Sequence, residues 1–163
     1  MSAFKASSLV LAGLAVSLLA SLAVAQDVRP GYGLTVNLAT AKKLAASAAA
    51  EAEKNNWNVA IAVVDNHGYL VYYEKMDDTQ TASVMVAIDK ARSAAIYRRP
   101  TRVFEELVNK GGRPSVANLQ GASMVTGGLP ILVGGKVIGG IGVSGVTSDQ
   151  DEQVAKAGLE GAK

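Results

Sequence analysis

Two pairs of β-rich segments, each joined by a very short turn, constrain the fold more than any other feature of the chain. Valine, isoleucine, leucine and tyrosine dominate four short stretches, at residues 57–65, 69–75, 129–133 and 137–144. Asp65-Asn66-His67-Gly68 joins the first two stretches, and Gly134-Gly135 joins the last two. Strands joined by such tight turns must be antiparallel neighbours. The sequence therefore predicts two β-hairpins.

Two longer segments have helical periodicity instead. Apolar residues recur at helical spacing in residues 39–55 and 82–99. Asn37 can cap the first helix by accepting an early backbone N–H. Pro100 disfavours helical backbone at the residue before it, so the second helix is expected to end there.

The rest of the chain supplies shorter elements. Thr101 can cap a short helix that runs through Asn109, a loop follows, and residues 122–126 are expected to form a short strand. A last helix begins at Thr147 or Ser148. The resulting order is helix, hairpin, helix, short helix, hairpin, helix. This order predicts an α+β fold in which helices pack against an antiparallel sheet.

The N-terminal segment is typical of a secretory signal peptide. Lys5 precedes an apolar run that ends in small residues at Ala23 and Ala25, as signal peptidase requires. The run is shorter than the roughly 20 apolar residues of a transmembrane anchor. We therefore expect a signal peptide at residues 1–25 and one mature domain at 26–163, without a stable membrane anchor. The mature protein would be periplasmic or secreted.

Composition excludes several kinds of chemistry. The 163 residues include no cysteine and one histidine, which excludes disulfides, thiolate nucleophiles and multi-histidine metal sites within one chain. Sixteen basic and 14 acidic residues give a net charge of +2. That balance argues against a nucleic-acid partner, because such proteins bind through an excess of positive charge.

One glycine-rich stretch matches the pattern of a dinucleotide site but lies in the wrong context. Gly140-Ile141-Gly142-Val143-Ser144-Gly145 falls inside a predicted strand, whereas the dinucleotide motif lies in a turn that opens a helix. Acidic residues in the following helix would repel a pyrophosphate. We interpret the glycines as points of close backbone approach, either to a packed helix or to a bound flat ligand.

His67, in the first hairpin turn, is the only histidine that could carry chemistry. It could be a solvated turn residue, with Asp65 bonding the turn amides. It could instead ligate a metal or haem iron, or act as an acid or base oriented by Asp65. The sequence leaves these alternatives open.

Basic residues gather around Pro100. They are Lys90, Arg92, Arg98, Arg99 and Arg102. Cations stabilise a helix C-terminus, which accounts for the cluster without any ligand. Alternatively, the guanidinium groups could bind carboxylates such as haem propionates, and Tyr97 within the cluster could ligate iron as a phenolate.

Three segments together resemble the GlcG/HbpS family, also called the haem-degrading family. They are Ala60-Ile61-Ala62-Val63-Val64-Asp65-Asn66-His67-Gly68, then Lys90-Ala91-Arg92-Ser93-Ala94-Ala95 with Arg99-Pro100-Thr101, then Gly127-Gly128-Leu129-Pro130 leading to Gly139-Gly140-Ile141-Gly142. The resemblance implies a profilin-like α+β fold, assembly into homo-oligomers and a tetrapyrrole ligand, which is haem in exported members and a corrinoid in some others. Some members are described as degrading haem, and others lie beside glycolate or diol pathways.

The leading hypothesis is therefore an exported, oligomeric haem-binding protein, with haem rather than a corrinoid as the cofactor. His67, Tyr97 or Thr101 would approach the iron, and Arg98, Arg99 and Arg102 would pair with the propionates. Two alternatives stand beside it: an enzyme or accessory protein for a small oxidised metabolite, and a non-catalytic assembly or sensor module. The sequence does not decide whether the protein is an enzyme.

Overall fold

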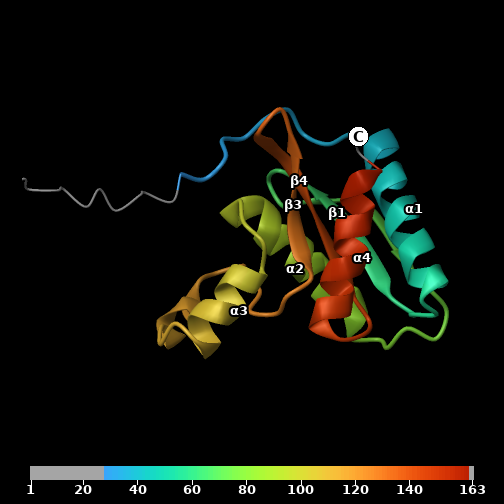
Figure 1. Cartoon of the computed structure of the whole chain (residues 1–163). Coiled ribbons are helices and arrows are strands. Elements are labelled where there is room, and N and C mark those ends of the chain that lie inside the picture. The colour runs from blue at the N-terminus through green and yellow to red at the C-terminus, as the bar shows by residue number, and fades with distance from the viewer. Residues whose placement is uncertain (1–27, 162–163) are drawn as a thin grey trace, which may run out of the picture.

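The computed structural model describes residues 28–161 as four α-helices and one four-stranded antiparallel sheet (Figure 1). The elements are α1 (Leu38–Lys54), β1 (Ala60–Asp65), β2 (Leu70–Lys75), α2 (Ser83–Tyr97), α3 (Arg102–Asn109), the 3-10 helix η1 (Pro114–Asn118), β3 (Gly128–Val133), β4 (Lys136–Ser144) and α4 (Ser148–Glu160). The predicted α+β class and both hairpins are confirmed. The predicted signal peptide at residues 1–25 lies outside the described residues.

The strand order in the sheet is β2-β1-β4-β3, so the two hairpins meet along their inner strands. Ala62 of β1 lies opposite Tyr73 of β2 on one side and Gly142 of β4 on the other. The turns of the two hairpins lie at the same end of the sheet, because β1 and β4 are antiparallel and β4 begins where β1 ends. Residues 31–33 join this end through an isolated bridge between Tyr32 and Val137.

Helices cover both faces of the sheet. Figure 1 shows α1 and α4 side by side on one face, with α2 on the other. Ile61 and Val63 of β1 pack toward α1 and α4, whereas Ala62 and Val64 pack toward α2. This alternation follows from the two-residue period of a strand.

The glycines of β4 allow α2 to approach the sheet closely. A Cβ atom at Gly142 would collide with the backbone carbonyl of Ala87, and one at Gly140 would collide with that of Ala91. Both carbonyls belong to α2. Of the two interpretations of the glycine-rich stretch, the structure thus shows the packed helix.

Two details differ from the sequence-based expectations. Residues 122–126 do not form a strand, because side chains take the amides that a strand would pair: Ser93 Oγ accepts from Ser123 N, and Glu105 Oε2 accepts from Thr126 N. Thr101 precedes α3 but does not cap it, because its hydroxyl accepts a hydrogen bond from Gly128 N.

The described residues give two further findings. No helix between residues 28 and 161 is long and apolar enough to cross a membrane. The same residues contain no cluster of three or more histidine, aspartate or glutamate side chains that could hold a metal ion.

Candidate functional site

A pocket of about 470 Å³ lies beside the turn of the first hairpin. Its lining residues are Tyr32, Asn66, His67, Tyr69 and Ile96, and we call it the His67 pocket. They come from the segment before α1, from the β1–β2 turn and from the last turn of α2. Pockets of this size hold small molecules and cofactors, and they combine apolar walls with a few polar groups. The His67 pocket likewise combines the apolar and aromatic side chains of Ile96, Tyr32 and Tyr69 with the polar side chains of Asn66 and His67.

Asp65 fixes the turn that carries His67. Its Oδ1 atom accepts hydrogen bonds from His67 N and Tyr69 N, each at 2.9 Å. Gly68 completes the turn with φ of +89°, a conformation that side chains disfavour. The Asp65 carboxylate therefore binds the amides of the turn, as one of the interpretations of the sequence expected, and does not orient the imidazole. The side chain of His67 is exposed and lines the pocket.

Asn66 brings an unused acceptor to the pocket. The residue is only 8% exposed, and its Nδ2 atom donates to Gly33 O at 2.8 Å. Its Oδ1 atom has no hydrogen-bond partner among residues 28–161. Buried polar atoms are nearly always paired with protein or with water, so an orphaned acceptor in a pocket wall favours a bound molecule or water beside it.

Tyr32, in the segment before α1, is the lining residue that Arg98 contacts. The Tyr32 hydroxyl donates to Ile96 O at 2.7 Å. The Arg98 guanidinium lies 5.1 Å from the centre of the Tyr32 ring and donates to Pro30 O at 3.1 Å. Arg98 holds a left-handed backbone conformation, with φ of +56°, at the end of α2. This conformation directs its side chain back toward residues 30–32 rather than onward along a helix.

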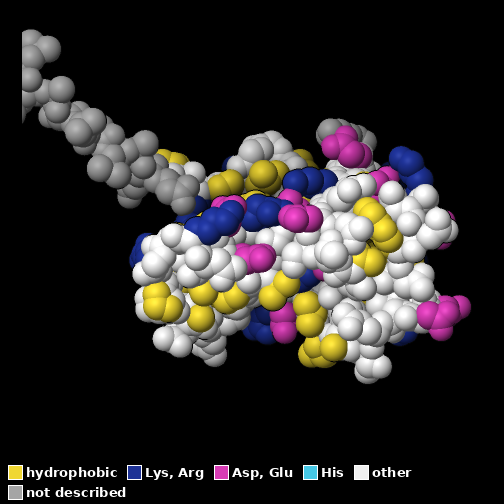
Figure 2. Space-filling model, turned by 60° about the horizontal axis from the view of Figure 1, so that its bottom comes forward, with side chains coloured by type: hydrophobic (Ala, Val, Ile, Leu, Met, Phe, Trp, Pro, Cys, Tyr) yellow, Lys and Arg dark blue, Asp and Glu magenta, His cyan; other side chains and the backbone are white. Residues whose placement is uncertain are grey.

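The predicted basic cluster is dispersed in the structure. Lys90 is buried, and its Nζ atom donates to Asp151 Oδ2 at 2.7 Å and to Val143 O at 2.9 Å. Burial raises the pKa of the Asp151 carboxyl, although the bond from Lys90 opposes that shift. On the face shown in Figure 2, basic and acidic side chains lie next to one another. Lys90, like Arg102, is therefore held in an ion pair within the fold.

Arg102 and Arg99 lie at the start of α3, away from His67. Arg102 donates to Glu152 through two nitrogens, each at 3.1 Å, and to Asp149 Oδ1 at 2.6 Å. Arg99 lies over the ring of Phe104, with 5.7 Å between the guanidinium carbon and the ring centre. Both residues thus have contacts that connect α3 to the rest of the fold.

Tyr97 and Thr101 also have protein partners. The Tyr97 hydroxyl donates to Gln120 O at 2.7 Å, and its ring contacts Phe104 edge to face. Thr101 is fully buried, and its hydroxyl oxygen accepts a hydrogen bond from Gly128 N. Of the site residues predicted from the sequence, the structure places His67 in the pocket lining and Arg98 against Tyr32 of that lining. It places Tyr97, Arg99, Thr101 and Arg102 around the α2–α3 connection.

The other four residues of the His67 pocket have weaker signals in the sequence than His67. Asn66 and Tyr69 lie beside His67 in the chain, so the turn itself indicates them. Tyr32 belongs to the segment before the first predicted helix, for which the sequence predicts no regular structure. Ile96 has the pattern of an ordinary apolar position in the second predicted helix. Only the folded arrangement shows that these two side chains reach the hairpin turn.

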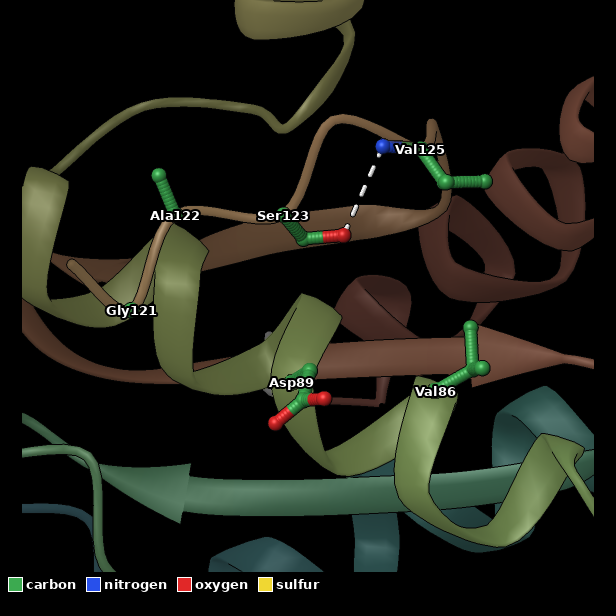
Figure 3. Close-up of a pocket in the computed structure, with 6 residues that line it drawn as sticks. All are labelled: Val86, Asp89, Gly121, Ala122, Ser123 and Val125. Atoms are coloured by element: carbon green, nitrogen blue, oxygen red, sulfur yellow. Dashed lines mark hydrogen bonds between the residues drawn. The ribbon is translucent and has the colours of Figure 1, made fainter. Parts of the chain in front are cut away.

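A second pocket, of about 410 Å³, lies between α2 and the loop before β3 (Figure 3). Val86 and Asp89 of α2 form one side, and residues 121–125 form the other. The loop is held by the hydrogen bond from Val125 N to Ser123 Oγ that is drawn in Figure 3. The charged group in its lining is a carboxylate, and the lining contains no imidazole. Unlike the His67 pocket, this pocket therefore offers no imidazole to a metal, and its carboxylate would repel an anionic ligand.

The fold and the site define a class of protein: an α+β domain with one antiparallel sheet and a ligand-sized pocket at a hairpin turn. A family model described as haem degrading protein HbpS-like matches residues 36–160, so the chain belongs to the HbpS-like family. This confirms the resemblance seen in the sequence.

Individual relatives support the same assignment. The chain is 44% identical to the protein GlcG of Escherichia coli K12 over 104 residues, which are 64% of this chain and 77% of GlcG. A crystal structure of a double mutant of Streptomyces reticuli HbpS matches with a TM-score of 0.73 and 31% identity, over 78% of this chain and 87% of that one. The structure of a PduOC:haem complex matches with a TM-score of 0.72 and 25% identity, over 78% and 95%.

Proposed function

We propose that this protein binds haem in the His67 pocket. The observation that carries the proposal is that the one histidine of the chain lines a pocket of ligand size together with two tyrosines. Membership of a family described as haem-degrading, and a matching structure that contains haem, support it. A corrinoid is the second tetrapyrrole that such a pocket could take.

The residues of the pocket fit the chemistry of haem. The macrocycle is a flat apolar disc, and Tyr32, Tyr69 and Ile96 offer apolar and aromatic surface to it. A neutral imidazole is a common protein ligand of haem iron, and the exposed side chain of His67 can reach a ligand in the pocket. Haem bound there would supply an iron centre for oxygen or electron chemistry.

Arg98 is the best placed of the three arginines predicted to bind propionates. Arg98 donates one N–H to Pro30 O and stacks on Tyr32, which lines the pocket. Its other N–H groups are therefore available to a ligand beside Tyr32. Arg102 is held by two carboxylates, and a propionate would have to compete with both. We therefore place a carboxylate of the ligand near Arg98.

The proposal also includes export and self-assembly. Residues 1–25 have the pattern of a cleavable signal, and the chain contains no thiol that an oxidising compartment would alter. We propose that the mature protein is periplasmic or secreted and forms homo-oligomers, as the family resemblance implies.

Titration with haemin tests the proposed function. We expect the Soret band of haemin to shift on addition of the protein and to saturate near one haem per chain. His67→Ala should weaken binding by about tenfold or more, a loss of at least about 1.4 kcal/mol. Asp89→Asn, in the second pocket, is the matched control and should leave the titration unchanged. A wild-type protein that leaves the Soret band unshifted would contradict the proposal.

A further inference from the structure

Arg92 lies beside the His67 pocket and takes part in none of the contacts described so far. It is an exposed residue of α2, one helical turn before Ile96. Residues four apart on a helix project from the same face, and Ile96 lines the pocket. The stem of Arg92 therefore runs along the side of α2 that faces the hairpin turn.

Gly68 shows how closely Arg92 approaches that turn. A Cβ atom at Gly68 would lie 2.8 Å from Arg92 Cγ and 3.4 Å from Arg92 Nε. The same atom would lie 3.1 Å from Ile96 Cγ2. The arginine side chain thus passes directly over the glycine that follows His67, a lining residue of the pocket.

The Arg92 guanidinium has no polar partner in the part of the chain that the structure describes. Among residues 28–161 it makes no hydrogen bond and no ion pair, even with Asp89 one turn earlier. Arg98 and Arg102, by contrast, both donate hydrogen bonds to the protein. An unpaired guanidinium at the edge of an aromatic pocket is ready to bind a carboxylate, because its N–H groups match both carboxylate oxygens.

We propose that Arg92 forms a carboxylate-binding subsite at the rim of the His67 pocket. The subsite would hold an acidic edge of the ligand by a charge-assisted hydrogen bond, and it would select tetrapyrroles with free carboxylates over esterified or uncharged ones. This inference deepens the proposed function and rests on it. Arg98, which stacks on Tyr32 of the pocket lining, would be the second basic group near the ligand.

Haemin and its dimethyl ester provide the test, because they differ only in their carboxylates. Arg92→Gln removes the charge and keeps a polar side chain on the exposed face of α2. We expect it to weaken haemin binding by about tenfold and to leave binding of the dimethyl ester unchanged. Arg92→Lys should lose less, since it keeps the charge but not the planar fork. Lys42→Gln, which removes an exposed charge from α1, should change neither affinity.

Two results would overturn the inference while leaving haem binding intact. One is an Arg92→Gln protein that binds haemin as tightly as the wild type. The other is an equal loss for haemin and for its ester, which would show that Arg92 supports the shape of the turn and does not contact the carboxylate. Failure of the wild-type protein to bind either compound would instead refute the proposed function, and the subsite with it.

Discussion

Gly142 illustrates how a single residue sets the distance between two layers of this fold. The residue lies in β4 directly under α2, where even a methyl group would meet the carbonyl oxygen of Ala87. Because the backbone fixes the positions of both the Cβ atom and the carbonyl oxygen, no side-chain rotation can relieve the collision. The sequence pattern alone suggested close approach at this position, and the structure identifies what approaches.

Gly142→Ala should therefore destabilise the protein strongly. We expect a loss of about 3 kcal/mol in the free energy of unfolding, the upper part of the range for overpacked cores, measured by urea denaturation. Gly31→Ala is the control, because nothing lies within 4 Å of a Cβ atom there. It should change stability by about 0.5 kcal/mol or less. Equal effects of the two substitutions would show that α2 does not pack on Gly142 as described.

Lys90 shows a residue whose role the sequence could not reveal. In the chain it belongs to a group of cations and looks like part of a surface patch, yet it is fully buried against Asp151. The partner is 61 residues away in the chain, so no local pattern connects the two. His67 is the opposite case, because its rarity in the sequence and its place in a turn both indicate the pocket that it lines.

At the level of elements, Arg102 connects α3 to α4. It donates to Glu152 and Asp149 of α4, and Lys156 donates to Glu152 Oε2 at 2.6 Å from the next turn. The hydrogen bond from Arg102 lowers the pKa of Asp149. Burial acts to raise the pKa of Glu152, but the bonds from Arg102 and Lys156 outweigh burial, so this pKa is also lowered.

This link should make stability depend on pH. The ordinary pKa values of the two carboxyls are 3.8 and 4.5, and folding lowers both. Their contribution is therefore fully present above those values and is lost as the pH falls through the lower folded-state values. Arg102→Gln should cost about 1 kcal/mol at pH 7, a small effect because the arginine is partly exposed. The difference from wild type should shrink toward pH 3 in urea unfolding. A difference that stays constant from pH 7 to pH 3 would contradict this account.

The elements themselves were largely predictable. Periodicity, the turn residues and the cap at Asn37 locate the main helices and strands to within a few residues, because these signals are local. Residues 122–126 were assigned wrongly as a strand for the same reason. Their amides bond to side chains of α2 and α3, which are distant in the chain and invisible to a local pattern.

On the scale of the whole molecule, the candidate site depends on three segments meeting at one end of the sheet. The hairpin turn contributes His67, α2 contributes Ile96, and the segment before α1 contributes Tyr32. The turn could be chosen from the sequence, since it holds the only histidine. The other two segments could not, because their position follows from the order of the strands and from the packing of α2 across them.

Nuclear magnetic resonance of the isotope-labelled protein during a haemin titration tests the central claim most directly. The iron of haemin is paramagnetic, so it broadens the amide resonances of nearby residues. Haem in the His67 pocket should selectively broaden the signals of Tyr32, residues 66–69 and Ile96, and should spare those of Val86 and residues 121–125 around the second pocket. Broadening centred on the second pocket, or none at all with saturating haemin, would contradict the assignment of the His67 pocket as the haem site.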